Sequence, residues 1–150
     1  PRFKVSQNYG PEHIDCITKT VGQLLANTAD TRRPAMLLGK IQSGKTRTFL
    51  GVMALAFENG YDVAIVLTKN STPLAAQTLS RIESDLCVDG EVLAFDIMQV
   101  PRLEAADLLA KLIIVSKKED DNINRLIISV SFGNEFDSNL WISLVFFLSF

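Results

Sequence analysis

Two glycines, a lysine and a threonine stand at close spacing in the stretch GKIQSGKT, residues 39–46. This stretch matches G-x-x-x-x-G-K-[ST], the pattern of a phosphate-binding loop. Gly39 lets the chain leave a strand in a conformation that a side chain would obstruct, and Gly44 lets the backbone pass close to phosphate oxygens. Lys45 has the reach and charge for the β- and γ-phosphates, and the Thr46 hydroxyl can ligate Mg²⁺.

The backbone of this loop supplies the rest of the predicted phosphate site. Its amides, together with the start of the following helix, form a nest of positive partial charge for the α- and β-phosphates. The sequence therefore predicts that ATP and Mg²⁺ are the cofactors. The residues predicted to bind them are Gly39, Gln42, Ser43, Gly44, Lys45 and Thr46, with Thr46 on the metal.

Hydrolysis of ATP requires an acidic residue that holds Mg²⁺ and positions the attacking water. Asp96, which ends the apolar run VLAFD, is one candidate for this catalytic role, and the alternative is an ordinary turn residue at a strand end. Glu119, Asp120 and Asp121 follow two lysines and resemble the charged start of a helix. No DExD or DExH string occurs, so we expect nucleotide binding without a complete hydrolytic site.

The elements that must position these residues alternate between helices and strands. Helical spacing of apolar residues predicts helices over residues 11–27, 45–59, 70–86 and 101–111. Short apolar runs predict strands over residues 35–38, 62–68, 91–97 and 111–116. Strands separated by helices favour an α/β fold with a parallel sheet flanked by helices and right-handed crossovers.

Apolar residues at intervals of three and four predict which face of each helix is buried. The predicted buried residues are Ile14, Ile17, Val21, Leu24 and Leu25 in the first helix, Phe49, Val52, Met53, Ala56 and Phe57 in the second, and Ala75, Leu79, Ile82 and Leu86 in the third. Gly60 is placed to end the second helix, and Ser71 or Thr72 can cap the third.

Composition limits the classes of protein that the chain can represent. A length of 150 residues with 47% hydrophobic content suits one domain, and a net charge of −2 argues against a general polyanion binder. Cys16 and Cys87 are far apart and form no metal-binding or disulfide pattern, which favours a reducing, cytoplasmic location. The closing apolar run from Leu140 is shorter than the roughly 20 residues that a membrane-spanning helix needs.

The chain divides into two parts by composition. Residues 1–128 carry the motifs and are predicted to form a partial nucleotide-binding domain with an N-terminal helix. Residues 129–150 form an apolar tail that holds five of the nine phenylalanines and no lysine or arginine. A buried final strand is one interpretation of this tail. The other is that the reading frame or the ordered sequence of a longer protein has been lost near this point. An exposed apolar tail would favour self-association.

The segment from Met36 to Ile82 resembles the start of a DEAD/DEAH-box-type helicase, a superfamily-two P-loop ATPase with a RecA-like first domain. It is most similar to the bacterial branch whose loop reads GxxQSGKT, and the resemblance covers about residues 9–128. In such helicases the segment after the second core strand contacts the backbone of DNA or RNA. The resemblance assigns this contact to Thr68, Lys69, Ser71 and Thr72, and an ordinary capped helix is the alternative.

The resemblance also implies features that this sequence does not supply. A glutamine upstream of the loop reads adenine in these proteins, and Gln7 and Gln23 are both candidates here. The acidic magnesium motif is expected soon after residues 111–127, where the chain instead continues as the apolar tail, and the second RecA-like domain with its arginine finger is absent. We therefore expect the ATP-binding part of a helicase-like ATPase. A non-catalytic nucleotide-binding or interaction module that ends naturally at Phe150 is the alternative, and a small-molecule kinase is a third possibility.

Overall fold

The computed structural model describes residues 9–26, 45–87, 90–99, 110–119, 121 and 143–147. The chain divides into two compact units, residues 1–59 and 60–150, and each unit is described by itself. The predicted strand over residues 35–38 and all but the last two residues of the helix predicted over 101–111 lie outside the described residues. No helix in the described part of the chain is both long enough and apolar enough to span a membrane.

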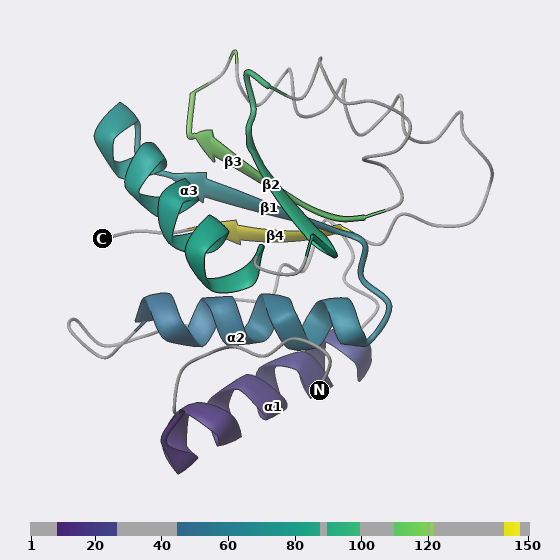
Figure 1. Cartoon of the computed structure of the whole chain (residues 1–150). Coiled ribbons are helices and arrows are strands. Elements are labelled where there is room, and N and C mark those ends of the chain that lie inside the picture. The colour runs from purple at the N-terminus through teal and green to yellow at the C-terminus, as the bar shows by residue number, and fades with distance from the viewer. Residues whose placement is uncertain are drawn as a thin grey trace. The chain divides into compact units, whose positions relative to one another are not determined.

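The first unit contains two helices in contact, α1 from Pro11–Ala26 and α2 from Lys45–Glu58 (Figure 1). Pro11 suits the first position of α1, because the amide that proline lacks has no partner there. Gly60, with a φ of 98°, follows α2 in the conformation that ends helices. Both helices therefore begin and end within two residues of the predicted limits.

The prediction of buried residues is confirmed for α2, whereas for α1 it included residues that are exposed. All five predicted residues of α2 are buried. In α1, Ile17 and Val21 are buried, whereas Ile14 and Leu25 are 53% and 51% exposed. These two side chains lie roughly 60° and 80° around the helix from Ile17, on one flank of the contact with α2. The contact is narrow because it is made close to a glycine of α2, Gly51.

The second unit is a parallel sheet of strands β1 (Val63–Thr68), β2 (Val92–Asp96), β3 (Lys111–Lys117) and β4 (Ser143–Phe147). The strand order is β2-β3-β1-β4, so β3 lies between β1 and β2, the two strands that precede it in sequence (Figure 1). The α/β class and the parallel sheet predicted from the sequence are therefore confirmed. The apolar tail contributes the strand β4, which pairs with β1.

Burial follows the position of each strand in the sheet. All six residues of β1 and the middle five of β3 are buried, as expected of central strands covered on both faces. The edge strand β2 is buried only at its first residue. Alternate residues of these strands form one apolar cluster on one face of the sheet, with Ile97 after β2: Val63, Ile65 and Leu67 from β1, Leu112 and Ile114 from β3, and the half-buried Leu93 and Phe95 from β2.

Helix α3, from Thr72–Leu86, joins β1 to β2 and contacts β2 and β3. Its buried residues include three of the four predicted, Ala75, Ile82 and Leu86, but Thr78 is buried while Leu79 is only half-buried. Thr78 tolerates burial because its hydroxyl donates a hydrogen bond to the carbonyl of Leu74, at 2.8 Å. The periodicity alone could not reveal this, because a threonine counts as polar in the pattern.

A polar contact fixes the amino ends of the two central strands. The Lys111 ammonium lies 2.6 Å from a carboxylate oxygen of Asp62, and the Leu112 amide donates to the Asp62 carbonyl at 2.9 Å. These bonds set the register in which Val63 of β1 lies opposite Leu112 of β3. That register in turn brings the carboxyl ends of β1 and β3 together at the opposite edge of the sheet.

Candidate functional site

The predicted phosphate loop leads directly into α2. Lys45 and Thr46 are the first two residues of this helix, so the helix begins where the sequence pattern requires it. The other predicted loop residues, Gly39, Gln42, Ser43 and Gly44, lie outside the described residues. The first amides of any helix have no partner within the helix, and the first turn of α2 contains no acidic residue. This helix end therefore carries positive partial charge suited to an anion.

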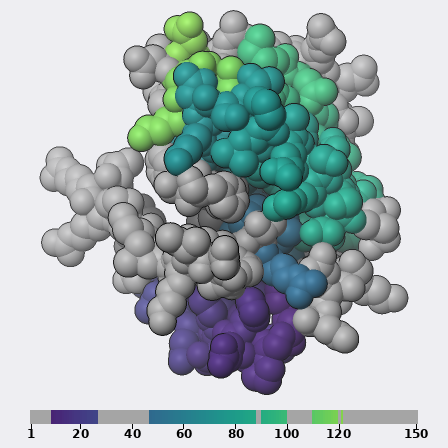
Figure 2. Space-filling view, turned by 90° about the vertical axis from the view of Figure 1, so that its left-hand side faces the viewer, coloured from purple at the N-terminus to yellow at the C-terminus, as the bar shows by residue number. Residues whose placement is uncertain are grey.

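In the second unit, polar residues gather at the carboxyl edge of the sheet. Thr68, Asp96 and Lys117 are the last residues of β1, β2 and β3, and parallel strands end at one edge. Open α/β sheets bind their ligands outside this edge. Figure 2 shows residues of α3, in teal, beside residues in the range of β3, in light green, on one face of the protein.

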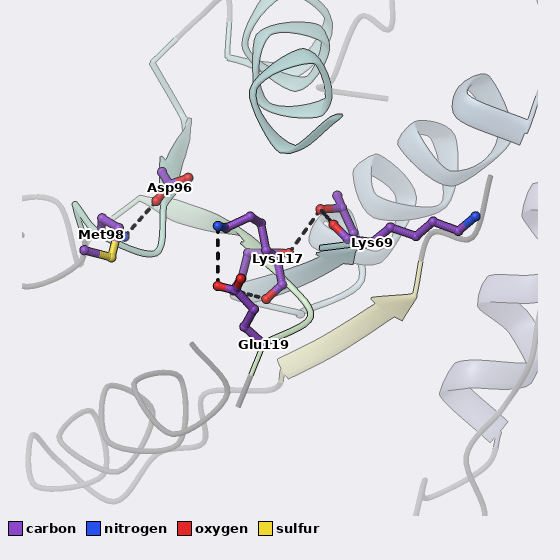
Figure 3. A network of polar contacts seen from close by, with 7 residues as sticks. Lys69, Asp96, Met98, Lys117 and Glu119 are labelled. Atoms are coloured by element: carbon purple, nitrogen blue, oxygen red, sulfur yellow. Dashed lines mark hydrogen bonds and ion pairs between the residues drawn. The ribbon is translucent and has the colours of Figure 1, made fainter. Parts of the chain in front are cut away.

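Thr68 holds the ends of β1 and β3 together. Its side chain is 1% exposed, and its hydroxyl lies 3.1 Å from the Lys69 carbonyl and 3.5 Å from the Ser116 carbonyl (Figure 3). The Lys118 amide donates to the Thr68 carbonyl at 2.9 Å. The Thr68 hydroxyl is thus buried and bonded to backbone carbonyls. The polar groups exposed at the surface belong to the residues that follow Thr68.

The chain after β1 turns sharply into α3. The Ser71 amide donates to the Lys69 carbonyl at 2.7 Å, which closes a tight turn, and Ser71 is the N-cap of α3. Its side chain makes no capping hydrogen bond, although its backbone is extended as an N-cap requires. The predicted capped helix is therefore confirmed in position but not in its side-chain bond. Lys69 and Thr72 are exposed, and Figure 3 shows Lys69 extending away from the sheet.

The end of β3 carries an ion pair beside this turn. The Lys117 ammonium lies 3.4 Å from a carboxylate oxygen of Glu119, and the Glu119 amide donates to the Lys117 carbonyl (Figure 3). Lys118, between them, is exposed. Neither Lys118 nor Lys69 forms an ion pair with any residue that the structure describes. Glu119, one of the alternative acids, thus has a cationic neighbour.

The carboxylate of Asp96 accepts a hydrogen bond within the turn that follows β2. One carboxylate oxygen accepts the Met98 amide at 2.9 Å, and the Asp96 amide donates to the side chain of Gln99 at 2.9 Å (Figure 3). Asp96 lies opposite Val115 of β3, two residues before β3 ends, and β3 separates β2 from β1. This arrangement is the turn that the sequence offered as the alternative to a catalytic role, and the catalytic role stays a prediction.

Among the described residues, the thiol of Cys87 has the pKa that lies furthest from its ordinary value. Burial raises its pKa to about 11, the nearby Glu83 carboxylate adds to the rise, and a backbone hydrogen bond from Ala94 opposes it. Cys87 therefore stays a neutral thiol at physiological pH and is no candidate nucleophile. Cys16, which is half-buried on α1, is also a free thiol.

Of the two candidates for reading adenine, only Gln23 lies among the described residues. Gln23 is exposed on α1, and Gln7 lies outside the described residues. Among the residues that the structure describes, no group of three or more histidine, cysteine, aspartate or glutamate side chains could hold a metal ion.

Sequence reasoning missed several residues that build these arrangements. Tyr9 donates its hydroxyl to the Arg47 carbonyl at 3.0 Å, and Gln99 caps the amide of Asp96. Lys118 joins the turn after β1 through its backbone amide. The sequence offers no signal for such backbone contacts, because they depend on which strands and helices become neighbours.

Comparison of the chain with protein-family models, with curated proteins and with solved structures finds no match. The fold class rests on the parallel sheet and the helices described above.

Proposed function

We propose that the chain is the ATP-binding part of a helicase-like, nucleic-acid-dependent ATPase. The observation that carries the proposal is the start of α2 at Lys45, directly after the glycine-containing loop GKIQSGKT. Few arrangements use a lysine–threonine pair at the first two positions of a helix after such a loop, and phosphate binding is the one with a physical reason for every residue.

In this proposal each residue of the loop has one task. Gly39 and Gly44 let the backbone, including Gln42 and Ser43, wrap the α- and β-phosphates, and the positive end of α2 lies behind them. Lys45 contacts the β- and γ-phosphates, and Thr46 ligates Mg²⁺ together with phosphate oxygens and water. This list accounts for the six predicted binding residues.

The surface after β1 supports a contact with the nucleic-acid backbone. Lys69 and Thr72 are exposed, Ser71 leaves the first amides of α3 without a side-chain cap, and Thr68 holds the turn in place. Ammonium, hydroxyl and amide donors are the groups that contact phosphodiesters, irrespective of base sequence. The partner is therefore DNA or RNA, recognised through its backbone.

Hydrolysis by this chain alone is not part of the proposal. Asp96 already accepts the Met98 amide, and Glu119 is paired with Lys117. A second RecA-like domain would have to supply an arginine finger, which is worth about 10³–10⁵ in rate where it is used. The same observations favour the second candidate function, a nucleotide-binding module that does not turn over ATP.

The test is calorimetric titration of MgATP into the wild-type chain and into Lys45→Ala. The substitution removes the mobile cation from the β- and γ-phosphates, and we expect the affinity to fall about ten- to a hundredfold. Lys19→Ala is the matched control, because Lys19 is an exposed lysine of α1 that pairs with Asp15. Equal affinities of wild type and Lys45→Ala would refute the assignment of the loop.

A further inference from the structure

Helix α1 approaches α2 closely at Gly51. A β-carbon added to Gly51 would collide with Cδ1 of Ile17, lie 3.1 Å from its Cγ1 and 3.4 Å from the Tyr9 hydroxyl. Glycine at this position costs helix stability, since glycine is about 1 kcal/mol worse than alanine in a helix interior. The close approach of the two helices is thus the physical reason for a glycine here.

A hydrogen bond ties the same turn of α2 to the residues before α1. The Tyr9 hydroxyl donates to the Arg47 carbonyl at 3.0 Å. In an α-helix this carbonyl also accepts the amide of the residue four positions on, which is Gly51. Tyr9 and Ile17 therefore converge on one turn of α2. Arg47 directly follows Lys45 and Thr46, the two residues that open the helix.

We propose that α1 is a positioning element for the phosphate loop, and that docking of α1 and binding of nucleotide stabilise each other. The proposal rests on the proposed function of the loop. Tyr9 and Ile17 hold the first turns of α2, and the direction of that helix end sets the direction of its first backbone amides. Coupling between two such equilibria is reciprocal, so nucleotide must strengthen the docking of α1 by the same factor. Tyr9 is thus a positioning residue rather than a catalytic one.

The structure of α1 suits an element that can detach. Of its 16 residues only Ile17 and Val21 are buried, and Ile14 and Leu25 are more than half exposed. Few buried apolar contacts give a segment a low free energy of local opening. A ligand that binds at the start of α2 can therefore shift the equilibrium between docked and detached α1.

Two glycine-to-alanine variants test the proposal. In Gly51→Ala the new β-carbon collides with Ile17, whereas in Gly22→Ala, on α1, it meets no atom within 4 Å. Both substitutions add the same helix propensity, so the second is the matched control. Combining Gly51→Ala with Ile17→Val removes the colliding Cδ1 but keeps a branched apolar side chain at this buried position, and should restore docking. Tyr9→Phe deletes only one hydroxyl and keeps the test valid if Gly51→Ala does not fold.

Two readouts are measured on the full chain: the affinity for MgATP, and hydrogen exchange of the α1 amides with and without MgATP. We expect Gly51→Ala to bind MgATP at least about fivefold more weakly than Gly22→Ala, the lower end of ordinary coupling energies. Tyr9→Phe should weaken binding in the same direction, and the double variant should recover most of the loss. In the wild type, MgATP should slow exchange in α1.

The outcomes separate this inference from the proposed function. Failure of the wild type to bind MgATP overturns the proposed function, and the coupling with it. Normal binding by the wild type, abolished by Lys45→Ala but unchanged in Gly51→Ala and in Tyr9→Phe, overturns the positioning role alone. Exchange in α1 that does not respond to MgATP has the same meaning.

Discussion

The side chain of Asp96 illustrates how a turn competes with a catalytic role. Its carboxylate accepts the Met98 amide, and Gln99 covers its own amide. To bind Mg²⁺ through that oxygen, the carboxylate would have to share it with, or release, the amide that it now satisfies. Met98 is 56% exposed, so water can take over the bond of its amide and the release costs little. The turn therefore opposes recruitment of Asp96 to a metal only weakly.

Replacement of Asp96 distinguishes these two roles. Asp96→Asn keeps an oxygen for the Met98 amide, so we expect stability to change by less than about 1 kcal/mol. We also expect no nucleic-acid-stimulated ATP turnover in the wild type for this substitution to remove. Steady-state assays with single-stranded DNA or RNA, on wild type, Asp96→Asn and Lys45→Ala, provide the measurement. Stimulated turnover lost in both variants would show that the site is complete after all.

The thiol of Cys87 gives a pH-dependent prediction. Its pKa is about 11 in the folded chain against an ordinary value of 9.0, so the folded state holds the proton more tightly. Below pH 9 both states are protonated and stability is unaffected. As pH rises from about 9 to 11 the unfolded state loses its proton first, so this group's contribution falls.

Alkylation measures the same property. In a Cys16→Ser background at pH 8.5, native Cys87 should react with iodoacetamide far more slowly than the urea-unfolded chain, up to about a hundredfold, because the thiolate fraction is smaller. Cys87→Ser should remove the labelled site. Equal rates in the native and unfolded chains would contradict the raised pKa.

Lys69 carries a prediction about the proposed nucleic-acid contact. Lys69→Ala should weaken binding to all single-stranded sequences alike, and should reduce the dependence of log affinity on log salt by about one unit. Lys19→Ala, on α1, is the control with the same change of charge. Fluorescence anisotropy at several salt concentrations tests this, and an unchanged slope for Lys69→Ala would argue against a phosphate contact.

At the scale of elements, apolar runs and periodicity predicted where most helices and strands begin and end. The limits of α2, β1 and β3 agree with those predictions to within one residue. These elements are buried nearly throughout, so their sequences contain continuous or regularly spaced apolar residues. The narrower face of α1 was not predictable, because exposure of Ile14 depends on the close contact of Ile17 with a glycine of another helix.

The order of the strands in the sheet could not be predicted from the sequence either. Patterns along the chain say that strands are parallel, but the position of β3 between β1 and β2 depends on long-range pairing. The same limit applies to the candidate site. The glycine loop was readable because its residues are contiguous, whereas the contact of Lys118 with Thr68 links two strands 50 residues apart in the numbering.

The central position of β3 predicts a steep dependence of stability on its core residues. Ile113 is fully buried, with 0% exposure, and Ile113→Ala should lower the free energy of unfolding by about 2–5 kcal/mol. Leu93→Ala, on the edge strand β2 where Leu93 is half-buried, should cost clearly less. Urea unfolding followed by circular dichroism compares the two variants, and equal losses would contradict the observed strand order.

For the whole molecule, five residues of the apolar tail, 143–147, belong to the sheet. The strand β4, Ser143–Phe147, pairs with β1 along five residues. A strand in the tail is therefore confirmed for residues 143–147, whereas the predicted burial of this strand stays a prediction. This changes the expected effect of truncation, because removal of the tail also removes a partner of β1.

Truncation before Phe132 should increase self-association rather than reduce it. Without β4, the apolar strand β1 presents unpaired amides and carbonyls along one edge, which is a template for pairing with another chain. Light scattering over a range of concentrations compares the full and truncated chains. A truncated chain that stays monomeric, with the full chain associating, would support the exposed apolar tail instead.

The pairing of β4 with β1 has a consequence for synthesis on the ribosome. β1 ends at Thr68 and β4 begins about 75 residues later, at Ser143. At roughly 5–20 residues per second, β1 waits on the order of 4–15 s before the strand that covers its outer edge has been made. During that interval the nascent chain exposes an apolar strand edge, so we expect β1 to be a segment that chaperones recognise.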